Sequence, residues 1–378
     1  MFNNFKLGAK ICIVVSVCVL LMVLILSFII SYQSHKILLK EAMLLIDNAN
    51  SRTTNRAVGL FDQVSATVQF ASDRMNAALI RNEIISEQET LDIVNSLSKT
   101  SEFIEYAYVI FSNSHSFLSK NGNGFRMDDS VKNILNQNNN NDGLHISDPF
   151  RIQIQNENIF TIELSVNILN AQKQKIGTLG ILYNLDVLSK DLLHARRSIF
   201  EGDRRFLMTR EGVIFLHPNK DFLGKNLKEI NPHQSAQDIL TASSNNERGI
   251  YDYHFKNQNE DYMAATQLFN ILNSKQTFIM VTLAPKKSIY QPFYDLLFNI
   301  IVTSLISILV VIVIISYYVK FYISTRIENV SKHLFSFFKY INFKSNELPR
   351  DLQPRANDEI GQMAKAINEN ILATKQGL

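Results

Sequence analysis

The chain of 378 residues is almost neutral, with 38 lysines and arginines against 35 acidic residues, a net charge of +3 and a pI near 8.6. Because no basic block is present, nucleic acid is not an expected partner. Both cysteines, Cys12 and Cys18, lie in an apolar N-terminal stretch, which excludes a disulfide framework or a cysteine metal site elsewhere. The length allows two or three folded units.

Two apolar segments are long enough to cross a bilayer. Residues 11–32 lie in a run of 25 uncharged residues between Lys10 and Lys36, and residues 296–319 form a second run of 24. Each exceeds the roughly 20 residues that a transmembrane helix needs. A signal peptide usually has an apolar core of about 7–15 residues and a small-residue cleavage site, and the first segment is longer and lacks such a site. We therefore predict two transmembrane helices.

Basic residues that flank the two segments predict their orientation. Lys6 and Lys10 precede the first segment, and Lys320 and Arg326 follow the second, so both termini, including residues 1–10, are expected in the cytoplasm. Residues 33–294 would then lie outside. Three tyrosines suit the inner membrane interface, at positions 317, 318 and 322.

Residues 33–98 carry the pattern of one long stalk helix outside the membrane. The segment from 36 to 98 has no proline and a single glycine, and apolar or small residues recur every three or four positions. This stripe consists of Ala42, Ile46, Ala49, Thr53, Ala57, Leu60, Val64, Val68, Ala71, Met75 and Ala78. Because many of these side chains are small, we expect the outer part to pack on its own domain and the inner part on a second copy of the chain.

From about residue 99 the period of the sequence changes to that of β-strands. Each strand-like run is bounded by Asn, Gly and Asp clusters. These runs are at 103–112, 159–168 and 176–185. A helical pattern follows at 186–200, and the polar run at 136–143 is expected to be a surface loop. The pattern predicts an α+β module over 99–198.

A second cycle of the same kind begins at residue 204. Residues 204–230 predict a strand, a Glu-Gly turn, a second strand and a Pro-Asn loop that leads into a short helix. Three further strands are predicted at 249–255, 261–269 and 277–285. We therefore predict a second α+β module over 199–292, stacked on the first.

Two stretches of this outer region resemble a known family. Residues 212–230, "GVIFLHPNKDFLGKNLKEI", and residues 283–292, "LAPKKSIYQP", resemble the double Cache ectodomain of bacterial chemoreceptors. The resemblance implies an α+β fold in which a long N-terminal helix carries two stacked Cache (PAS-like) modules. It also implies a multi-pass protein of the bacterial inner membrane, with a periplasmic ectodomain whose module at 99–198 is membrane-distal and whose module at 199–292 is membrane-proximal.

The C-terminal region, 320–378, resembles a HAMP domain. Residues 337–371 are similar to the version found in chemoreceptors of Helicobacter and Campylobacter, and "DEIG" at 358–361 resembles the start of the second HAMP helix. Many first HAMP helices carry a proline near their start, whereas "YISTRIENV" has none.

The periodicity of this region fits the same interpretation. A coiled-coil seam with spacings of 4, 3, 4, 3 and 4 is formed by Ile323, Ile327, Val330, Leu334, Phe337 and Ile341. Pro349 and Pro354 break the helix, and a second helix starts at Asp358. One face of that helix presents Ile360, Met363, Ile367 and Ile371. Two short helices per chain form a parallel four-helix bundle only as a homodimer.

The resemblance implies a methyl-accepting chemotaxis receptor, a signal transducer rather than an enzyme, that senses a small periplasmic solute. In the family, the last helix continues into a cytoplasmic hairpin that contacts a histidine kinase and a coupling protein. That hairpin is missing from this sequence, so we expect the chain to be a fragment. Two alternatives stay open: the input half of a sensor histidine kinase or cyclic-dinucleotide enzyme, and an ectodomain that binds a protein partner.

No pattern in the sequence predicts catalysis, a cofactor or a metal site. The eight histidines are scattered without metal-ligand spacing, and no nucleophile elbow, phosphate-binding loop or GxGxxG motif is present. His217, in "HPNKD", is interpreted as a structural turn residue. The run "KNGNG" at 120–124 is also interpreted as a turn.

The resemblance places the ligand site in the membrane-distal module. Family members that bind amino acids carry an Arg and a Trp-Tyr pair before a Tyr-x-Asp, and a further Asp on the last strand. This sequence has no Trp, its Tyr-x-Asp position is similar to Phe150-Arg151-Ile152, and its last strand offers Leu182, Tyr183 and Asn184. Because an unpaired buried ammonium is costly, the missing acids favour a small carboxylate without an amine, such as a hydroxy or keto acid, over an amino acid.

Eight residues of this module are predicted to contact the ligand. Tyr106 and Tyr108 share one face of the first predicted strand, and a phenol can donate a hydrogen bond to a carboxylate. Arg126 and Arg151 are candidate bidentate partners of a carboxylate. The other four form an apolar wall or contact a ligand hydroxyl: Phe150 and Tyr183 for the wall, Asn184 or Ser147 for the hydroxyl.

Overall fold

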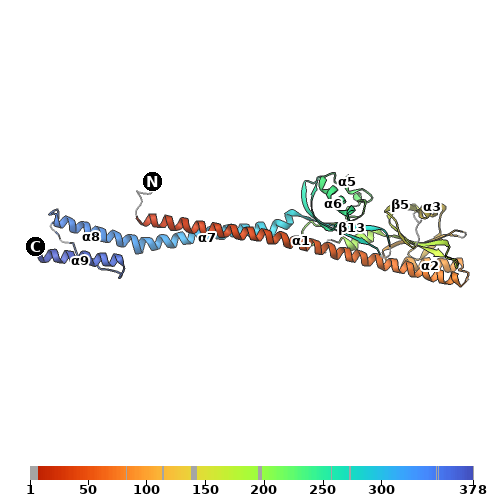
Figure 1. Cartoon of the computed structure of the whole chain (residues 1–378), viewed down its shortest axis with the longest axis horizontal. Coiled ribbons are helices and arrows are strands. Elements are labelled where there is room, and N and C mark those ends of the chain that lie inside the picture. Colours follow the sequence, from red (N-terminus) through yellow and green to blue (C-terminus); the bar gives the residue numbers. More distant parts are fainter. Residues whose placement is uncertain are drawn as a thin grey trace. The chain divides into compact units, whose positions relative to one another are not determined.

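The computed structural model describes residues 7–81, 83–112, 115–137, 143–194, 198–256, 258–271, 274–345, 347 and 349–377. The chain divides into two compact units. One is Ile37–Pro292, and the other combines Met1–Lys36 with Phe293–Leu378. The helices and strands of both are labelled in Figure 1.

The predicted stalk helix is interrupted before it reaches residue 98. α1 covers Leu7–Ile80, and a separate helix, α2, covers Glu87–Lys99. Ser86 caps α2 with a capping box, in which its hydroxyl accepts the Glu89 N–H at 3.2 Å and the Glu89 carboxylate accepts the Ser86 N–H at 2.9 Å. The single helix predicted over 33–98 is therefore wrong, because a Ser-x-x-Glu start signal outweighs the continuing apolar period.

The first module is built on a six-stranded antiparallel sheet with the strand order β3-β2-β1-β8-β7-β4. Its strands are β1 (Ile104–Phe111), β2 (Phe117–Lys120), β3 (Asn123–Arg126), β4 (Leu144–Ile146), β7 (Glu163–Leu169) and β8 (Lys175–Tyr183). A separate hairpin and two helices complete it: β5 (Phe150–Ile154), β6 (Glu157–Thr161), α3 (Asp129–Gln137) and α4 (Leu185–Leu192). The strands predicted at 103–112 and 176–185 are confirmed as the central pair, β1 and β8.

Two predictions for this module need correction. The strand predicted at 159–168 is divided at Ile162, because β6 pairs with β5 whereas β7 pairs with β4 and β8. An uninterrupted run of β-forming residues does not reveal that it serves two sheets. The helix predicted at 186–200 ends as α4 at Leu192. Within it, residues 195–197 lie outside the described residues, as do 138–142 of the predicted polar loop.

The turn predicted at 120–124 is confirmed and connects β2 to β3. Asn121 and Gly122 have φ of 51° and 78°, the left-handed conformations that a two-residue hairpin turn requires. The sequence reading nevertheless missed the two short strands on either side, and also α3, β4 and β5, because each is brief and lacks a clear period.

The second module is a five-stranded antiparallel sheet with the order β10-β9-β13-β12-β11. Its strands are β9 (Arg204–Thr209), β10 (Ile214–Leu216), β11 (Gly249–Phe255), β12 (Glu260–Asn270) and β13 (Thr277–Pro285). All five coincide with predicted strands. Three short helices accompany them: the 3-10 helix η3 (Lys220–Phe222), α5 (Leu227–Ile230) and α6 (Gln234–Ser244).

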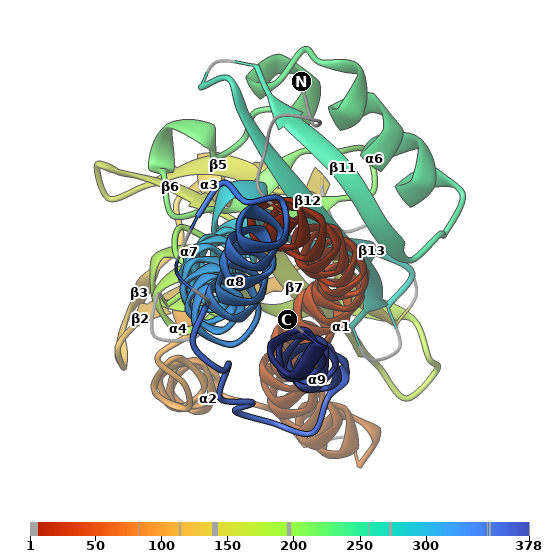
Figure 2. The ribbon, with the colours of Figure 1, turned by 90° about the vertical axis from the view of Figure 1, so that its left-hand side faces the viewer.

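α1 packs against both sheets of this unit. The ring of Phe61 on α1 lies 5.0 Å from that of Tyr183 on β8 and 6.3 Å from that of Phe278 on β13, within one continuous apolar core. The opposite face of the first sheet packs against α3 and the β5–β6 hairpin. The opposite face of the second sheet packs against α5 and α6, which Figure 2 shows on the side of the sheet away from α1.

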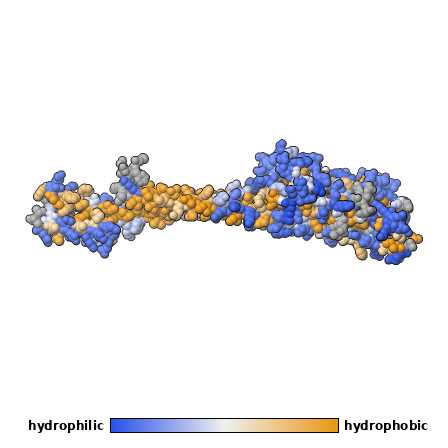
Figure 3. All heavy atoms as spheres, in the orientation of Figure 1, coloured by the Kyte–Doolittle hydropathy of each residue, from blue (hydrophilic) through white to orange (hydrophobic). Residues whose placement is uncertain are grey.

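The other unit holds two helical stretches that are long and apolar enough to cross a membrane, one within Gly8–Ile80 and one within Lys286–Ile341. The second comprises α7 (Lys286–Tyr318), a π-helix, η4 (Val319–Ser324), and α8 (Thr325–Ile341). Their apolar windows are not covered by protein and form the orange band in Figure 3. They coincide with the predicted transmembrane segments.

α8 is followed by an irregular connector and by α9 (Glu359–Gly377), which packs on α8. Val330 and Phe337 of α8 meet Ile367 and Ile371 of α9. The predicted face of α9 needs one correction, because Met363 is 54% exposed and the side chain of Ala364 is buried in its place.

One ion pair joins α8 to the start of α9. Arg326 donates two hydrogen bonds to the carboxylate of Asp358, one of them at 2.6 Å. Asp358 also accepts the Gly361 N–H at 2.9 Å. The Arg326 hydrogen bond and that backbone N–H lower the pKa of Asp358 to about 2.

Candidate ligand-binding site

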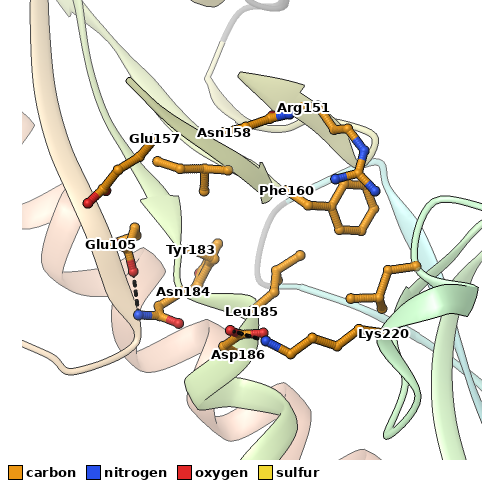
Figure 4. Close-up of a pocket in the computed structure, with 12 residues that line it drawn as sticks. Glu105, Arg151, Glu157, Asn158, Phe160, Tyr183, Asn184, Leu185, Asp186 and Lys220 are labelled. Carbon is orange, nitrogen blue, oxygen red and sulfur yellow. Dashed lines mark hydrogen bonds and ion pairs between the residues drawn. The ribbon is translucent and has the colours of Figure 1, made fainter. Parts of the chain in front are cut away.

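A cavity of about 420 Å³ lies where the first module meets the second. Its walls come from β1, the β5–β6 hairpin, the end of β8 and the start of α4, and the second module contributes η3 and Leu223. The volume is within the range of small-molecule sites in proteins, roughly 300–1,000 Å³. Figure 4 shows that charged side chains surround the space from several sides.

Asn184 fixes one corner of the cavity. It follows β8 and caps α4, because its side-chain oxygen accepts the Val187 N–H at 3.0 Å. Its side-chain amide donates a hydrogen bond to the carboxylate of Glu105 on β1. One residue therefore holds the end of the central strand, the start of α4 and an acidic side chain in a fixed arrangement.

Two glutamates form an acidic end of the cavity and share a single cation. Lys120 lies 2.8 Å from Glu105 and 2.7 Å from Glu157, and the Tyr106 hydroxyl donates to Glu157 at 3.2 Å. The Lys120 hydrogen bond lowers the pKa of Glu157. Burial opposes the charge of Lys120, but its hydrogen bonds to Glu105 and Glu157 outweigh that effect and raise its pKa.

A second ion pair connects the two modules across the cavity wall. Lys220 of η3 lies 2.7 Å from Asp186, which is in the first turn of α4. Both side chains are largely exposed, at 73% and 56%. The pair is therefore accessible to solvent from the cavity.

Arg151 is the cavity's cation without a carboxylate partner among the described residues. Its guanidinium lies 5.1 Å from the centre of the Phe160 ring, a cation–π contact between neighbouring strands of the β5–β6 hairpin. Stacking on the ring holds the guanidinium while leaving its N–H groups available. Figure 4 shows Arg151 and Phe160 on the side of the cavity opposite Glu105 and Glu157.

Of the eight predicted contacts, three line this cavity: Arg151, Tyr183 and Asn184. The ring of Tyr183 is directed into the core against Phe61, and burial raises the pKa of its phenol well above the usual range. Arg126 is exposed at the end of the edge strand β3 and does not line the cavity.

Tyr106 and Tyr108 share a face of β1, as predicted, but both are fully buried. The ring of Tyr108 crosses Gly180 on β8, where a Cβ would lie 2.5 Å from ring atoms. Its hydroxyl donates a hydrogen bond to Glu163 on β7, whose side chain is also fully buried. Gly180 is needed here because any side chain would displace the ring.

The two remaining predicted residues support this buried region. Ser147 accepts the Glu163 N–H at 2.9 Å and donates to the Asp148 carbonyl at 2.8 Å. Phe150 packs on the apolar cluster beneath the β5–β6 hairpin. Neither lines the cavity.

The two motif positions, Phe150-Arg151-Ile152 and Leu182-Tyr183-Asn184, carry no acid, as predicted, but acids from other positions reach this region. Glu105 and Glu157 line the cavity, and Glu163 is buried beside Tyr108. These glutamates lie on β1, β6 and β7, outside the two motif positions. The charges of Glu105, Lys120 and Glu157 are visible in the sequence, but their spacing does not indicate that they meet.

At the sheet face of the second module, the cavity lined by described residues measures about 20 Å³. His217 lies in this region as the predicted turn residue, with its Nδ1 accepting the Asn219 N–H at 2.8 Å. Burial lowers the pKa of His217 to about 4, so the ring is neutral at pH 7. Within the described residues, no group of three or more His, Cys, Asp and Glu side chains is arranged to hold a metal ion.

No protein-family model and no curated protein matches this sequence. Solved structures do resemble it. The periplasmic sensory domain of the Campylobacter jejuni chemoreceptor Tlp1 matches with a TM-score of 0.58 and 18% identity over 68% of this chain and 99% of that one. The extracellular domain of mmHK1S-Z3, described as a histidine kinase, matches with a TM-score of 0.51 and 16% identity over 69% and 99%.

A third similar structure is the ligand-binding domain of the Pseudomonas fluorescens chemoreceptor CtaA in complex with L-isoleucine. Its TM-score is 0.51 and its identity 13%, over 68% of this chain and 98% of that one. At these identities the similarity concerns the fold. The chain has the fold of sensory ectodomains that occur in chemoreceptors and in a histidine kinase. This confirms the prediction of a chemoreceptor-type sensory ectodomain.

Proposed function

We propose that this chain is a membrane-anchored sensory receptor of the chemoreceptor type, with a double Cache ectodomain that binds a small solute. Its fold and its two apolar helical stretches support this proposal. The protein acts as a signal transducer of the bacterial inner membrane and not as an enzyme. Its ectodomain, residues 33–294, is periplasmic, and both termini are cytoplasmic.

The observation that carries the ligand assignment is the unpaired Arg151. Glu105, Glu157 and Asp186 each have a cationic partner, whereas Arg151 borders the same cavity and pairs with no carboxylate among the described residues. A stacked guanidinium with free N–H groups recognises a carboxylate. The ligand is therefore a small carboxylate, such as a hydroxy or keto acid.

A second candidate ligand, an amino acid, is favoured by the acidic end of the cavity. Glu105 and Glu157 share the single cation Lys120, so this end has one negative charge in excess. An ammonium there and a carboxylate at Arg151 would balance both ends. CtaA, which has a similar fold, binds L-isoleucine in its solved structure.

The cytoplasmic part of the proposal is a HAMP bundle formed by two copies of the chain. The packing of α8 on α9 supports it, as do apolar side chains of α8 that remain exposed in one copy, such as Phe338 at 49% and Ile341 at 40%. Output to a histidine kinase and coupling protein would need a further C-terminal hairpin. The fold shared with mmHK1S-Z3 keeps the sensor-kinase alternative open.

The test is calorimetric titration of the full chain in lipid nanodiscs with lactate, pyruvate, succinate and alanine. We expect saturable binding of at least one carboxylate, weakened about 10- to 100-fold in Arg151→Met because a hydrogen-bonded charge is lost. Arg126→Met is the matched control, because Arg126 lies on the same module but outside the cavity. Equal affinities in the two variants, or no binding of any panel member, would overturn the proposal.

Glu157→Gln separates the two candidate ligands. It removes one carboxylate of the acidic end while keeping a hydrogen-bond acceptor for Tyr106. We expect weaker binding of alanine if the ligand is an amino acid, and unchanged or tighter binding of lactate if the ligand lacks an amine.

A further inference from the structure

The second module forms part of the cavity wall through the loop that starts at η3. Lys220 and Leu223 line the cavity. Gly224 follows in a left-handed conformation with φ of 80°, and a Cβ built on it would lie 3.4 Å from the ring of Phe160. The ring on which Arg151 stacks therefore lies next to the second module. A ligand at Arg151 would lie directly at the module boundary.

The ion pairs of the cavity differ in how firmly they are held. Glu105 and Glu157 share Lys120 and are each fixed by a further hydrogen bond, from Asn184 and Tyr106. The pair of Lys220 and Asp186 has a single contact and is largely exposed. An exposed single pair contributes little to stability, so it is the pair that an incoming anion can break most easily.

If the Lys220–Asp186 pair breaks, both charges remain in favourable surroundings. Asp186 lies in the first turn of α4, where the helix N-terminus favours a negative charge. Lys220 has a long flexible side chain that can reorient within the cavity. In Figure 4 the Lys220 side chain borders the same open space as Arg151.

The helix α4 also connects this region to α1. Arg56 of α1 donates two hydrogen bonds of 2.7 Å to the carboxylate of Asp191, five residues beyond Asp186 on α4. Loss of the Lys220–Asp186 pair at the N-terminal end of α4 would therefore affect a helix that is bonded to the long helix α1.

We propose that Lys220 is a ligand-binding residue contributed by the second module, and that an anionic ligand held by Arg151 takes Lys220 from Asp186. This inference rests on the proposed carboxylate site. The ligand then bridges cations of both modules, and the direct ion pair between the modules is lost. Ligand binding thereby changes the contact between the modules, because the ligand stabilises the arrangement in which Lys220 has left Asp186.

A double-mutant cycle on the full chain in nanodiscs tests the exchange, with lactate and succinate as probes. Lys220→Met should weaken binding about tenfold. Asp186→Asn should tighten it about two- to fivefold, because Lys220 no longer has a competing partner. In the double variant the gain from Asp186→Asn should vanish, since the lysine that it releases is gone. Lys228→Met, an exposed lysine of α5 away from the cavity, is the matched control.

The outcomes separate the inference from the proposed function. Suppose that Arg151→Met abolishes binding but Asp186→Asn tightens it equally with and without Lys220. The charge of Asp186 would then act on the ligand only through long-range electrostatics, and the transfer of Lys220 from Asp186 to the ligand would be refuted. The same holds if Lys220→Met matches Lys228→Met. If neither probe binds the unmodified chain, or Arg151→Met has no effect, the carboxylate site itself is refuted, and the exchange with it.

Discussion

The two modules share a sheet architecture but differ in what the chain does with it. The first module has a cavity of about 420 Å³ at its boundary, bordered by charged side chains, whereas the sheet face of the second has about 20 Å³. At that sheet face, aromatic side chains such as Phe206, Tyr253 and Tyr262 fill most of the space. The same architecture thus borders a charged cavity in the first module and is filled by aromatic side chains at the sheet face of the second, because such properties depend on the side chains and not on the fold.

The modules also share a core residue on α1, and removing it gives the largest expected effect. Phe61→Ala deletes a ring that contacts Tyr183 of the first sheet and Phe278 of the second, so it should destabilise both by about 3–5 kcal/mol. Hydrogen exchange of the full chain would show loss of protection in β8 and β13 together. Phe70→Ala, on the same helix but 71% exposed, is the control. Loss confined to one sheet would show that the modules are stabilised separately.

Acid pH should distinguish the modules through His217. The pKa of His217 is lowered to about 4 in the folded chain and is near 6.5 when unfolded, so its stabilising contribution is complete above pH 6.5 and is lost as the pH falls toward 4. At pH 5 the loss is on the order of 2 kcal/mol. Exchange rates corrected for intrinsic pH effects should rise in β9 and β10, with β1 and β8 as internal reference. His217→Gln should remove most of the acid-induced difference in exchange between β9–β10 and β1–β8. An unchanged difference would contradict the conclusion that protonation of His217 causes it.

The capping box at the start of α2 belongs to the first module, and its loss should have a milder effect. Ser86→Ala removes the side-chain half of the capping box and should cost about 1 kcal/mol. Faster amide exchange in the first turn of α2 would report it, with no change in the second sheet. Ser86→Asp keeps an acceptor at the cap and should behave like the unmodified chain. A similar cost in both variants would assign the effect to something other than capping.

The smallest effects are expected at the two ion pairs that connect α1 to the modules. Arg56 of α1 pairs with Asp191 of the first module, whereas Asp47 of α1 pairs with Arg248 of the second, so the charges are reversed. Because these pairs are partly exposed, Arg56→Met and Arg248→Met should each cost less than about 1 kcal/mol. Both costs, measured by exchange in α4 and β11, should shrink further in 1 M salt. A larger loss of stability in either variant would show that its ion pair contributes substantially to holding α1 on that module.

Much of the fold could be predicted because local pattern and tertiary role agree. The central strands β1 and β8 and all strands of the second sheet follow from runs of β-forming residues, and the apolar segments follow from length and composition. The division at Ile162 could not be predicted, because strand pairing there depends on partners far away in the sequence. The break before Ser86 was predictable from its Ser-x-x-Glu signal, although the apolar period that continues through this segment favours a single helix.

The candidate site was predicted less well than the fold. Tyr106 and Tyr108 share a face as their spacing requires, yet spacing does not say whether that face is open, and both rings are buried. Arg126 and Arg151 look alike in sequence, and only the hairpin geometry places Arg151 on Phe160 beside a cavity. Glu105 and Glu157 join the site through Lys120, a contact between three different strands.

By itself the sequence determined the apolar helical segments, the alternation of strands and short helices in two cycles, and the position of His217 in a turn. These features depend on periodicity and composition, which act over a few residues. Tertiary structure alone decided where the 420 Å³ cavity lies, that Arg151 borders it whereas Arg126 does not, and that Lys220 of one module meets Asp186 of the other. Such properties depend on the distances between side chains from separate elements, and those distances exist only once the chain has packed.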